Sequence, residues 1–143
     1  MANSRLALAL VLGTLGCAQP RQTTPHTVPQ TSIRWTGTWT WKQGPESLTL
    51  RLLQDGTTLT GTHSAIGQRG AKVDAIEENS AEPSIKGDIQ GAIAHVQFRT
   101  GFPDATGRGT ATLTLKNGQM YWQIVKSEDE HYFPKSARLS RAK

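Results

Sequence analysis

The sequence predicts an all-β fold, a single small antiparallel up-and-down β-barrel of about eight strands. Residues 33–139 are rich in threonine, glycine, valine and isoleucine and contain few long runs of helix-forming residues. Apolar and polar residues alternate along most of this region, as they do in strands with one buried face. Turn dipeptides separate these segments at about the 8–12 residue spacing of a barrel or sandwich.

The first three strands form an opening meander. Leucines alternate with polar residues over 48–52, and the Asp55-Gly56 dipeptide predicts a hairpin that leads into a strand over 59–65. The strand before them is expected at 33–41, where apolar or small residues occupy every second position: Ile33, Trp35, Gly37, Trp39 and Trp41. Three tryptophans therefore share one face.

The remaining strands follow in the same pattern. A weaker strand is expected at 71–76, and further strands are expected at 85–89, 92–98, 111–115 and 120–124. Consecutive hairpins without a long crossover favour a meander, and closing the meander removes its exposed edges. Basic residues end the chain, and we interpret them as a solvated tail: Lys135, Arg138, Arg141 and Lys143.

The N-terminus has the pattern of an export signal. Arg5 precedes an apolar stretch at 6–16 that is too short for a permanent transmembrane helix, and Cys17, the only cysteine, ends it. This boundary resembles the lipobox of bacterial lipoproteins, which implies a lipid on Cys17 and an anchor in the outer membrane. The alternative is cleavage after Ala18, which discards Cys17 and leaves a periplasmic or secreted protein.

The chain therefore divides into a signal peptide or lipobox at 1–18, a linker at 19–32 and a β-barrel domain at 33–143. The linker contains three prolines and several threonines, a composition typical of a flexible tether. The formal net charge of +5 permits attraction to anionic surfaces. Because an export signal precedes the domain, we do not expect nucleic acid as a partner.

The first hairpin resembles that of avidin-type barrels and, more loosely, of lipocalins. The resemblance rests on the segments TGTWTW and DGTTLTGTHSA, and it implies that Gly37 allows a bend while the Trp39 indole plugs one end of the barrel. The biotin-contacting side chains of the avidin family do not carry over, because Trp41, His63 and Ala65 stand at those positions. We therefore do not expect biotin binding.

The whole domain resembles a family of small uncharacterised secreted bacterial proteins. The resemblance includes Trp122 and Ile124 and the later tripeptide Tyr-Phe-Pro at 132–134. It implies a fold and an exported location, but no activity.

The candidate ligand-binding residues are four tryptophans and one inward-facing histidine: Trp35, Trp39, Trp41, His63 and Trp122. Tryptophans can stack against a sugar or fill a core, and a small barrel needs large side chains to fill it. We expect a core role for most of them. A tryptophan left at the barrel mouth is the first candidate for ligand contact.

No catalytic or metal-binding spacing is present, so we predict no cofactor, no metal and no enzymatic activity. Asp74 is expected to pair with Arg69 or Lys72, or to reach the barrel mouth. The sequence favours an envelope lipoprotein that binds a small molecule, a glycan or a protein partner at the open end of the barrel. The alternatives are a hydrolase or isomerase that uses Asp74, His63 or Glu128, and a purely structural surface protein.

Overall fold

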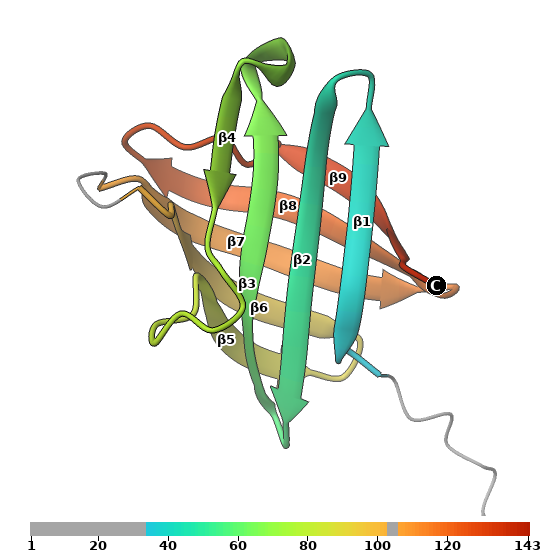
Figure 1. Ribbon diagram of the computed structural model, residues 1–143. Helices are drawn as coiled ribbons and strands as arrows, with labels where there is room; N and C mark the ends of the chain where they lie inside the picture. The colour runs from blue at the N-terminus through green and yellow to red at the C-terminus, as the bar shows by residue number, and fades with distance from the viewer. Residues whose placement is uncertain (1–33, 103–105) are drawn as a thin grey trace, which may run out of the picture. The chain divides into compact units, whose positions relative to one another are not determined.

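The computed structural model describes residues 34–102 and 106–143 as a closed antiparallel barrel of eight strands with one extra strand (Figure 1). The strands are β1 (Gly37–Gln43), β2 (Glu46–Asp55), β3 (Thr58–Gly67), β4 (Lys72–Ala75), β5 (Ile85–Gln90), β6 (Ile93–Arg99), β7 (Arg108–Lys116), β8 (Gln119–Glu128) and β9 (Ser136–Arg141). A 3-10 turn, η1 (Gln68–Gly70), joins β3 to β4. In these two ranges no helix is long and apolar enough to cross a membrane.

The predicted all-β barrel is confirmed, and each strand expected from the alternating pattern is present. Neighbours in the sheet follow the order β2-β1-β9-β8-β7-β6-β5-β3, and a β2–β3 pairing closes the ring. The predicted signal peptide, Cys17, Ala18 and the linker lie outside the described residues.

The C-terminal segment is a barrel strand, and our prediction of a solvated tail was wrong for residues 136–141. Strand β9 pairs with β8 and with β1, so it completes the ring. Ala137 and Leu139 are buried, Arg138 is exposed on the outer face, and Arg141 is exposed beside Trp39, with which it pairs. The Arg141 guanidinium lies 4.4 Å from the centre of the Trp39 ring. This strand contains only two buried residues, and several basic residues surround them. The alternation of apolar and polar residues was therefore too weak to predict it.

One edge of β3 has two partners. Residues 58–61 of β3 pair with β5, and residues 64–67 pair with the short strand β4. Among the described strands β4 pairs only with β3, so it lies outside the eight-stranded ring. The ladder between β3 and β5 therefore ends at Gly61, before the residues of β3 that pair with β4, and we call this change of partner the seam.

Side chains fill the barrel interior. Leucines, valine, isoleucine, alanines and the aromatic residues Trp35, Trp39, Phe98, Trp122 and Phe133 form one buried cluster. The Trp39 indole donates a hydrogen bond to the carbonyl of Trp35, and the Trp122 indole donates one to the carbonyl of Pro134. Both indole N–H groups thus keep partners on burial, and the large rings pack the core of the barrel.

Candidate functional site

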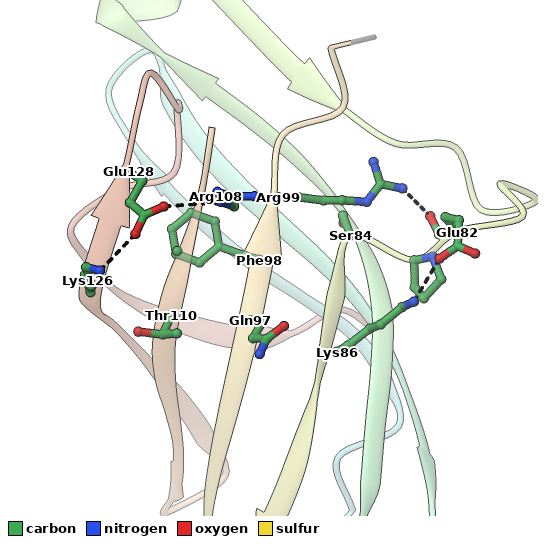
Figure 2. Close-up of a pocket in the computed structure, with 12 residues that line it drawn as sticks. Glu82, Ser84, Lys86, Gln97, Phe98, Arg99, Arg108, Thr110, Lys126 and Glu128 are labelled. Carbon is green, nitrogen blue, oxygen red and sulfur yellow. Dashed lines mark hydrogen bonds and ion pairs between the residues drawn. The ribbon is translucent and has the colours of Figure 1, made fainter. Parts of the chain in front are cut away.

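A groove of about 480 Å³ lies on the outer face of β5, β6, β7 and β8 (Figure 2). Two cross-strand rows of side chains build it. The first row is Lys86, Gln97, Thr110 and Lys126, and the second is Arg99, Arg108 and Glu128. Residues paired across neighbouring strands point to the same face of the sheet, so each row forms a continuous polar line.

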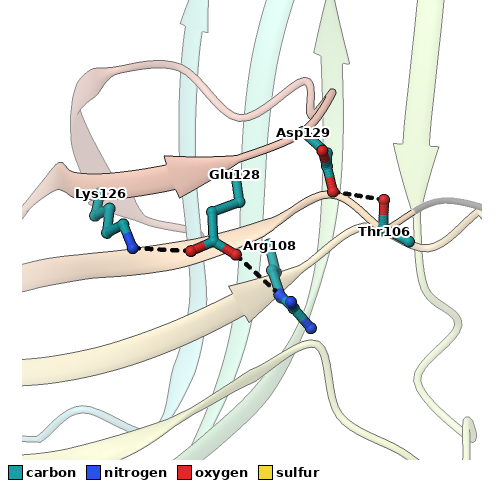
Figure 3. A network of polar contacts seen from close by, with 5 residues as sticks. All are labelled: Thr106, Arg108, Lys126, Glu128 and Asp129. Carbon is teal, nitrogen blue, oxygen red and sulfur yellow. Dashed lines mark hydrogen bonds and ion pairs between the residues drawn. The ribbon is translucent and has the colours of Figure 1, made fainter.

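Four basic side chains and two acidic ones line this groove, an excess of two positive charges. Arg108 Nε lies 3.3 Å from one oxygen of Glu128, and Lys126 Nζ lies 2.8 Å from the other (Figure 3). Lys86 Nζ pairs with Glu82 at 2.8 Å. Two cations therefore share the single carboxylate of Glu128.

Arg99 has no acidic partner side chain within ion-pair distance among the described residues. Its guanidinium donates a 2.7 Å hydrogen bond to the backbone carbonyl of Glu82 instead. Figure 2 shows Arg99 extending toward Glu82 across the upper side of the groove. The Arg99 charge thus forms no direct ion pair in the described part of the chain, although it acts at longer range on the Glu82 carboxylate and helps to lower its pKa.

Both groove carboxylates are held in the charged form. The Lys86 hydrogen bond and charge lower the pKa of Glu82, and the hydrogen bonds from Lys126 and Arg108 lower the pKa of Glu128. Since both side chains are largely exposed, solvent screens these interactions. The excess of two positive charges therefore persists at neutral pH.

A β-bulge directs the end of β8 toward the groove. Ala111 pairs with Ile124, but the preceding Thr110 pairs with Lys126, so Val125 is an extra residue and is 67% exposed. An extra residue in one strand reverses the alternation beyond it. Without the bulge, Lys126 and Glu128 would continue on the inward face of Trp122 and Ile124.

Gly109 lets the strands that form the groove approach each other. A Cβ at this position would lie 2.3 Å from the carbonyl oxygen of Lys126 and 2.6 Å from the ring of Phe98. Neither the backbone of β8 nor a buried ring can move away easily. The glycine is therefore required beneath the groove for steric reasons.

A buried polar cluster lies at the seam and comprises His63 on β3, Asp74 on β4 and Ser84 just before β5. His63 Nδ1 is 2.6 Å from Ser84 Oγ, and His63 Nε2 is 3.1 Å from Asp74 Oδ1. Asp74 Oδ1 also accepts a 2.7 Å hydrogen bond from the backbone N–H of Gly101. The expected pairing of Asp74 with Arg69 or Lys72 was wrong, because the carboxylate turns into the barrel wall.

These three residue types also occur in serine hydrolases, so their access to solvent matters. His63 and Asp74 are 0% exposed and Ser84 is 2% exposed. Within the described residues, His63 Nε2 and the second oxygen of Asp74 have no hydrogen-bond partner, so the 3.1 Å approach lacks hydrogen-bond geometry. In this structure the cluster connects β3, β4 and β5 across the seam.

The predicted ligand-binding residues do not lie together at an opening. Trp35, Trp39, Trp122 and His63 are buried in the barrel. Trp41 is half-buried and lines a small pocket at the end of the barrel. Of the residues proposed for an enzymatic alternative, His63 and Asp74 meet at the seam, whereas Glu128 lies in the groove.

Sequence reasoning missed the basic residues of the groove and Ser84. The groove residues come from four strands, and only the pairing register and the bulge bring them together. Outward positions could be predicted for single strands, but not which outward residues are neighbours. In the described ranges no group of three or more histidine, cysteine, aspartate or glutamate residues is placed to hold a metal ion.

Comparison of the sequence with models of known protein families found no match, and comparisons with curated proteins and with solved structures found none either.

Proposed function

We propose that this protein is a non-enzymatic binding protein whose groove on β5–β8 takes an anionic ligand that bears carboxylate, sulfate or phosphate groups. The observation that carries the proposal is the excess of two positive charges in the groove, with Arg99 free of any acidic partner side chain among the described residues. A planar guanidinium with open donors binds such oxyanions in a bidentate manner.

The size and arrangement of the groove support a ligand with more than one anionic group. Its volume of about 480 Å³ lies within the range of about 300–1,000 Å³ that is typical of ligand pockets. Arg99 is adjacent to Arg108 in the cross-strand row, and Lys126 lies on the next strand. A second anionic group would meet Arg108 and Lys126, which share only one carboxylate.

The packed barrel interior supports an external site. Large aromatic side chains occupy the space that holds the ligand in wider barrels. The ligand that we propose therefore binds outside the barrel wall.

The binding test uses three anionic probes and a matched set of variants. Titrations with inorganic pyrophosphate, with polygalacturonate and with phosphatidylglycerol vesicles distinguish a phosphate group, an acidic glycan and a lipid headgroup. We expect at least one probe to bind in a salt-dependent manner. We expect Arg99→Gln and Arg108→Gln each to weaken it by about tenfold to a hundredfold, since a charge-assisted hydrogen bond contributes about 1.5–3 kcal/mol.

Two further variants make the test specific. Lys116→Gln removes a positive charge from the opposite end of β7 and should leave binding nearly unchanged. Glu128→Gln should strengthen binding, because it releases Arg108 and Lys126 from their shared partner. Equal losses in Arg99→Gln and Lys116→Gln, or no binding of any probe, would contradict the proposal.

An enzymatic alternative is favoured by one observation, the contacts among Asp74, His63 and Ser84. In that reaction Ser84 Oγ would attack the carbonyl carbon of an ester while His63 accepts its proton and passes it to the departing alcohol, and water would then hydrolyse the acyl-enzyme to release the acid and free Ser84. Incubation with a fluorophosphonate probe tests it, followed by intact mass measurement. We expect no adduct, because Ser84 is shielded from solvent; an adduct on the native protein that disappears in Ser84→Ala would favour a hydrolase.

We further propose that the protein is exported, that it belongs with the small secreted bacterial proteins that it resembles, and that a lipid on Cys17 anchors it to the outer membrane. The support is the pattern of residues 1–18. In a bacterial host, Cys17→Ser should move the protein from the membrane fraction to the soluble periplasmic fraction. Identical fractionation of both forms would instead favour cleavage after Ala18.

A further inference from the structure

A second pocket lies at the end of the barrel where the β1–β2 turn meets the loop between β8 and β9. Its volume is about 190 Å³. We call it the mouth pocket and define it by the side chains that the argument uses: Trp41, Glu46, Glu130, His131 and Tyr132. Figure 1 shows the loop that supplies the last three passing behind the upper ends of β3 and β4.

The two carboxylates of the mouth pocket are held in place by neutral donors. Glu46 Oε1 accepts a 3.1 Å hydrogen bond from the backbone N–H of Arg69, and Glu130 Oε1 accepts a 2.8 Å hydrogen bond from the Tyr132 hydroxyl. Neither of these donors carries a positive charge. The negative charges of both residues therefore remain available to a ligand.

Two aromatic rings accompany these carboxylates. Trp41 is half-buried and packs against the core from one side. The Tyr132 ring packs perpendicular to the ring of Phe102, with the two ring centroids 5.7 Å apart. Gly67 lets the loop come close, since a Cβ there would lie 3.1 Å from Cβ of Tyr132. The rings are thus fixed by contacts with the rest of the barrel.

The electrostatics of the mouth pocket are opposite to those of the groove. Among the described residues that line it there is no lysine or arginine. Burial lowers the pKa of His131, although a backbone hydrogen bond at Phe133 and the charge of Asp74 partly oppose this, so the ring is uncharged at neutral pH. Glu46 and Glu130 therefore bring two negative charges to the lining of this pocket in a chain of formal net charge +5, and Glu130 also lines the neighbouring pocket that includes Lys72.

We infer that the mouth pocket binds a small organic cation through an ammonium head group. A cation gains attraction from the faces of tryptophan and tyrosine rings, with tryptophan the strongest partner. Carboxylates beside the rings add a Coulomb attraction that is larger in a half-enclosed site than in bulk water. This site shares no residue with the groove, so each can be tested without the other.

The probe is choline, compared with its uncharged isostere 3,3-dimethylbutan-1-ol. Both are titrated into the full-length protein at constant ionic strength while the indole N–H signals are followed by NMR. Trp41 is the only described tryptophan outside the buried core, so we expect its signal to shift in a saturable manner with choline. The neutral isostere should bind at least tenfold more weakly; equal binding of the two, or no shift with choline, would overturn the inference.

Variants assign the effect to the pocket. Glu130→Gln removes an exposed charge without removing volume and should weaken choline binding several-fold. Trp41→Leu should weaken it further, provided that circular dichroism shows a folded barrel. Glu128→Gln removes the same charge two residues away, in the groove, and should have no effect on choline. Equal effects of Glu128→Gln and Glu130→Gln would show attraction to net charge alone and would refute the site.

Discussion

His63 on β3 and Asp74 on β4 approach each other to 3.1 Å inside the barrel wall, and both side chains are fully shielded from solvent. They lie where β3 exchanges one partner strand for another. The backbone hydrogen bonds between β3 and β5 end there, and side chains make the contacts that hold the neighbouring segments together. Asp74 reaches Gly101, and His63 reaches Ser84.

We predict that Asp74→Ala destabilises the barrel by about 3 kcal/mol, because it leaves buried polar groups on Gly101 and His63 without their contact. Urea denaturation followed by tryptophan fluorescence measures the change. The control is Asp88→Ala, since Asp88 is exposed on β5 and should change the free energy of unfolding by less than about 0.5 kcal/mol. Similar losses in both variants would mean that the cluster does not stabilise the seam.

We predict that Phe133→Ala lowers the free energy of unfolding by about 3–5 kcal/mol, because it leaves a cavity at one end of the core. Phe133 lies in the loop after β8, and its ring is 4.3 Å from that of His63 and 4.6 Å from that of Phe98. Thermal and urea denaturation both report the loss. Phe102→Ala is the matched control, because Phe102 is exposed; a small effect of Phe133→Ala would show that this ring does not belong to the core.

We predict that Gly109→Ala destabilises the protein by about 1–3 kcal/mol and weakens anion binding, because the new methyl group overlaps a backbone oxygen of β8. Urea denaturation and the anion titration are carried out on the same sample. Thr110→Ala is the control for the stability measurement, since its side chain is exposed and has no such overlap. A Gly109→Ala variant as stable as the native protein would show that β7 and β8 can separate at this point.

We predict that the free energy of unfolding decreases over the pH range in which His131 takes up a proton. Its pKa in the folded state lies below the ordinary value of 6.5, because burial disfavours the charged ring. As the pH falls below about 6.5, the unfolded chain therefore takes up this proton first, and the free energy of unfolding decreases until the folded-state pKa is passed.

The pH dependence is measured as the urea midpoint at about pH 7.5 and about pH 5.5. We expect the decrease between these values to be smaller in His131→Gln than in the native protein. Glu82 and Glu128 do not affect this measurement. Their pKa values are lowered in the folded state, so their contributions to the free energy of unfolding are lost only as the pH falls below about 4.5. If the urea midpoint decreased as much in His131→Gln as in the native protein, the pH dependence would come from other groups.

The sequence alone determined the fold class and most strands of this protein. Alternating residues in the first hairpin and the turn dipeptide Asp55-Gly56 are local signals, and local signals are sufficient to predict strands and tight turns. The burial of Trp39 and Trp122 follows from the same alternation. Strand β9 was not predicted, because its two buried residues are surrounded by basic residues.

Only the tertiary structure decided the sites. The bulge at Val125 turns Lys126 and Glu128 outward, although continued alternation from Trp122 would have turned them inward. The division of one edge of β3 between two strands brings Asp74 to His63 rather than to Arg69 or Lys72. Both outcomes depend on the pairing register between strands, which is set by packing and hydrogen bonding across the whole barrel and which no single strand encodes.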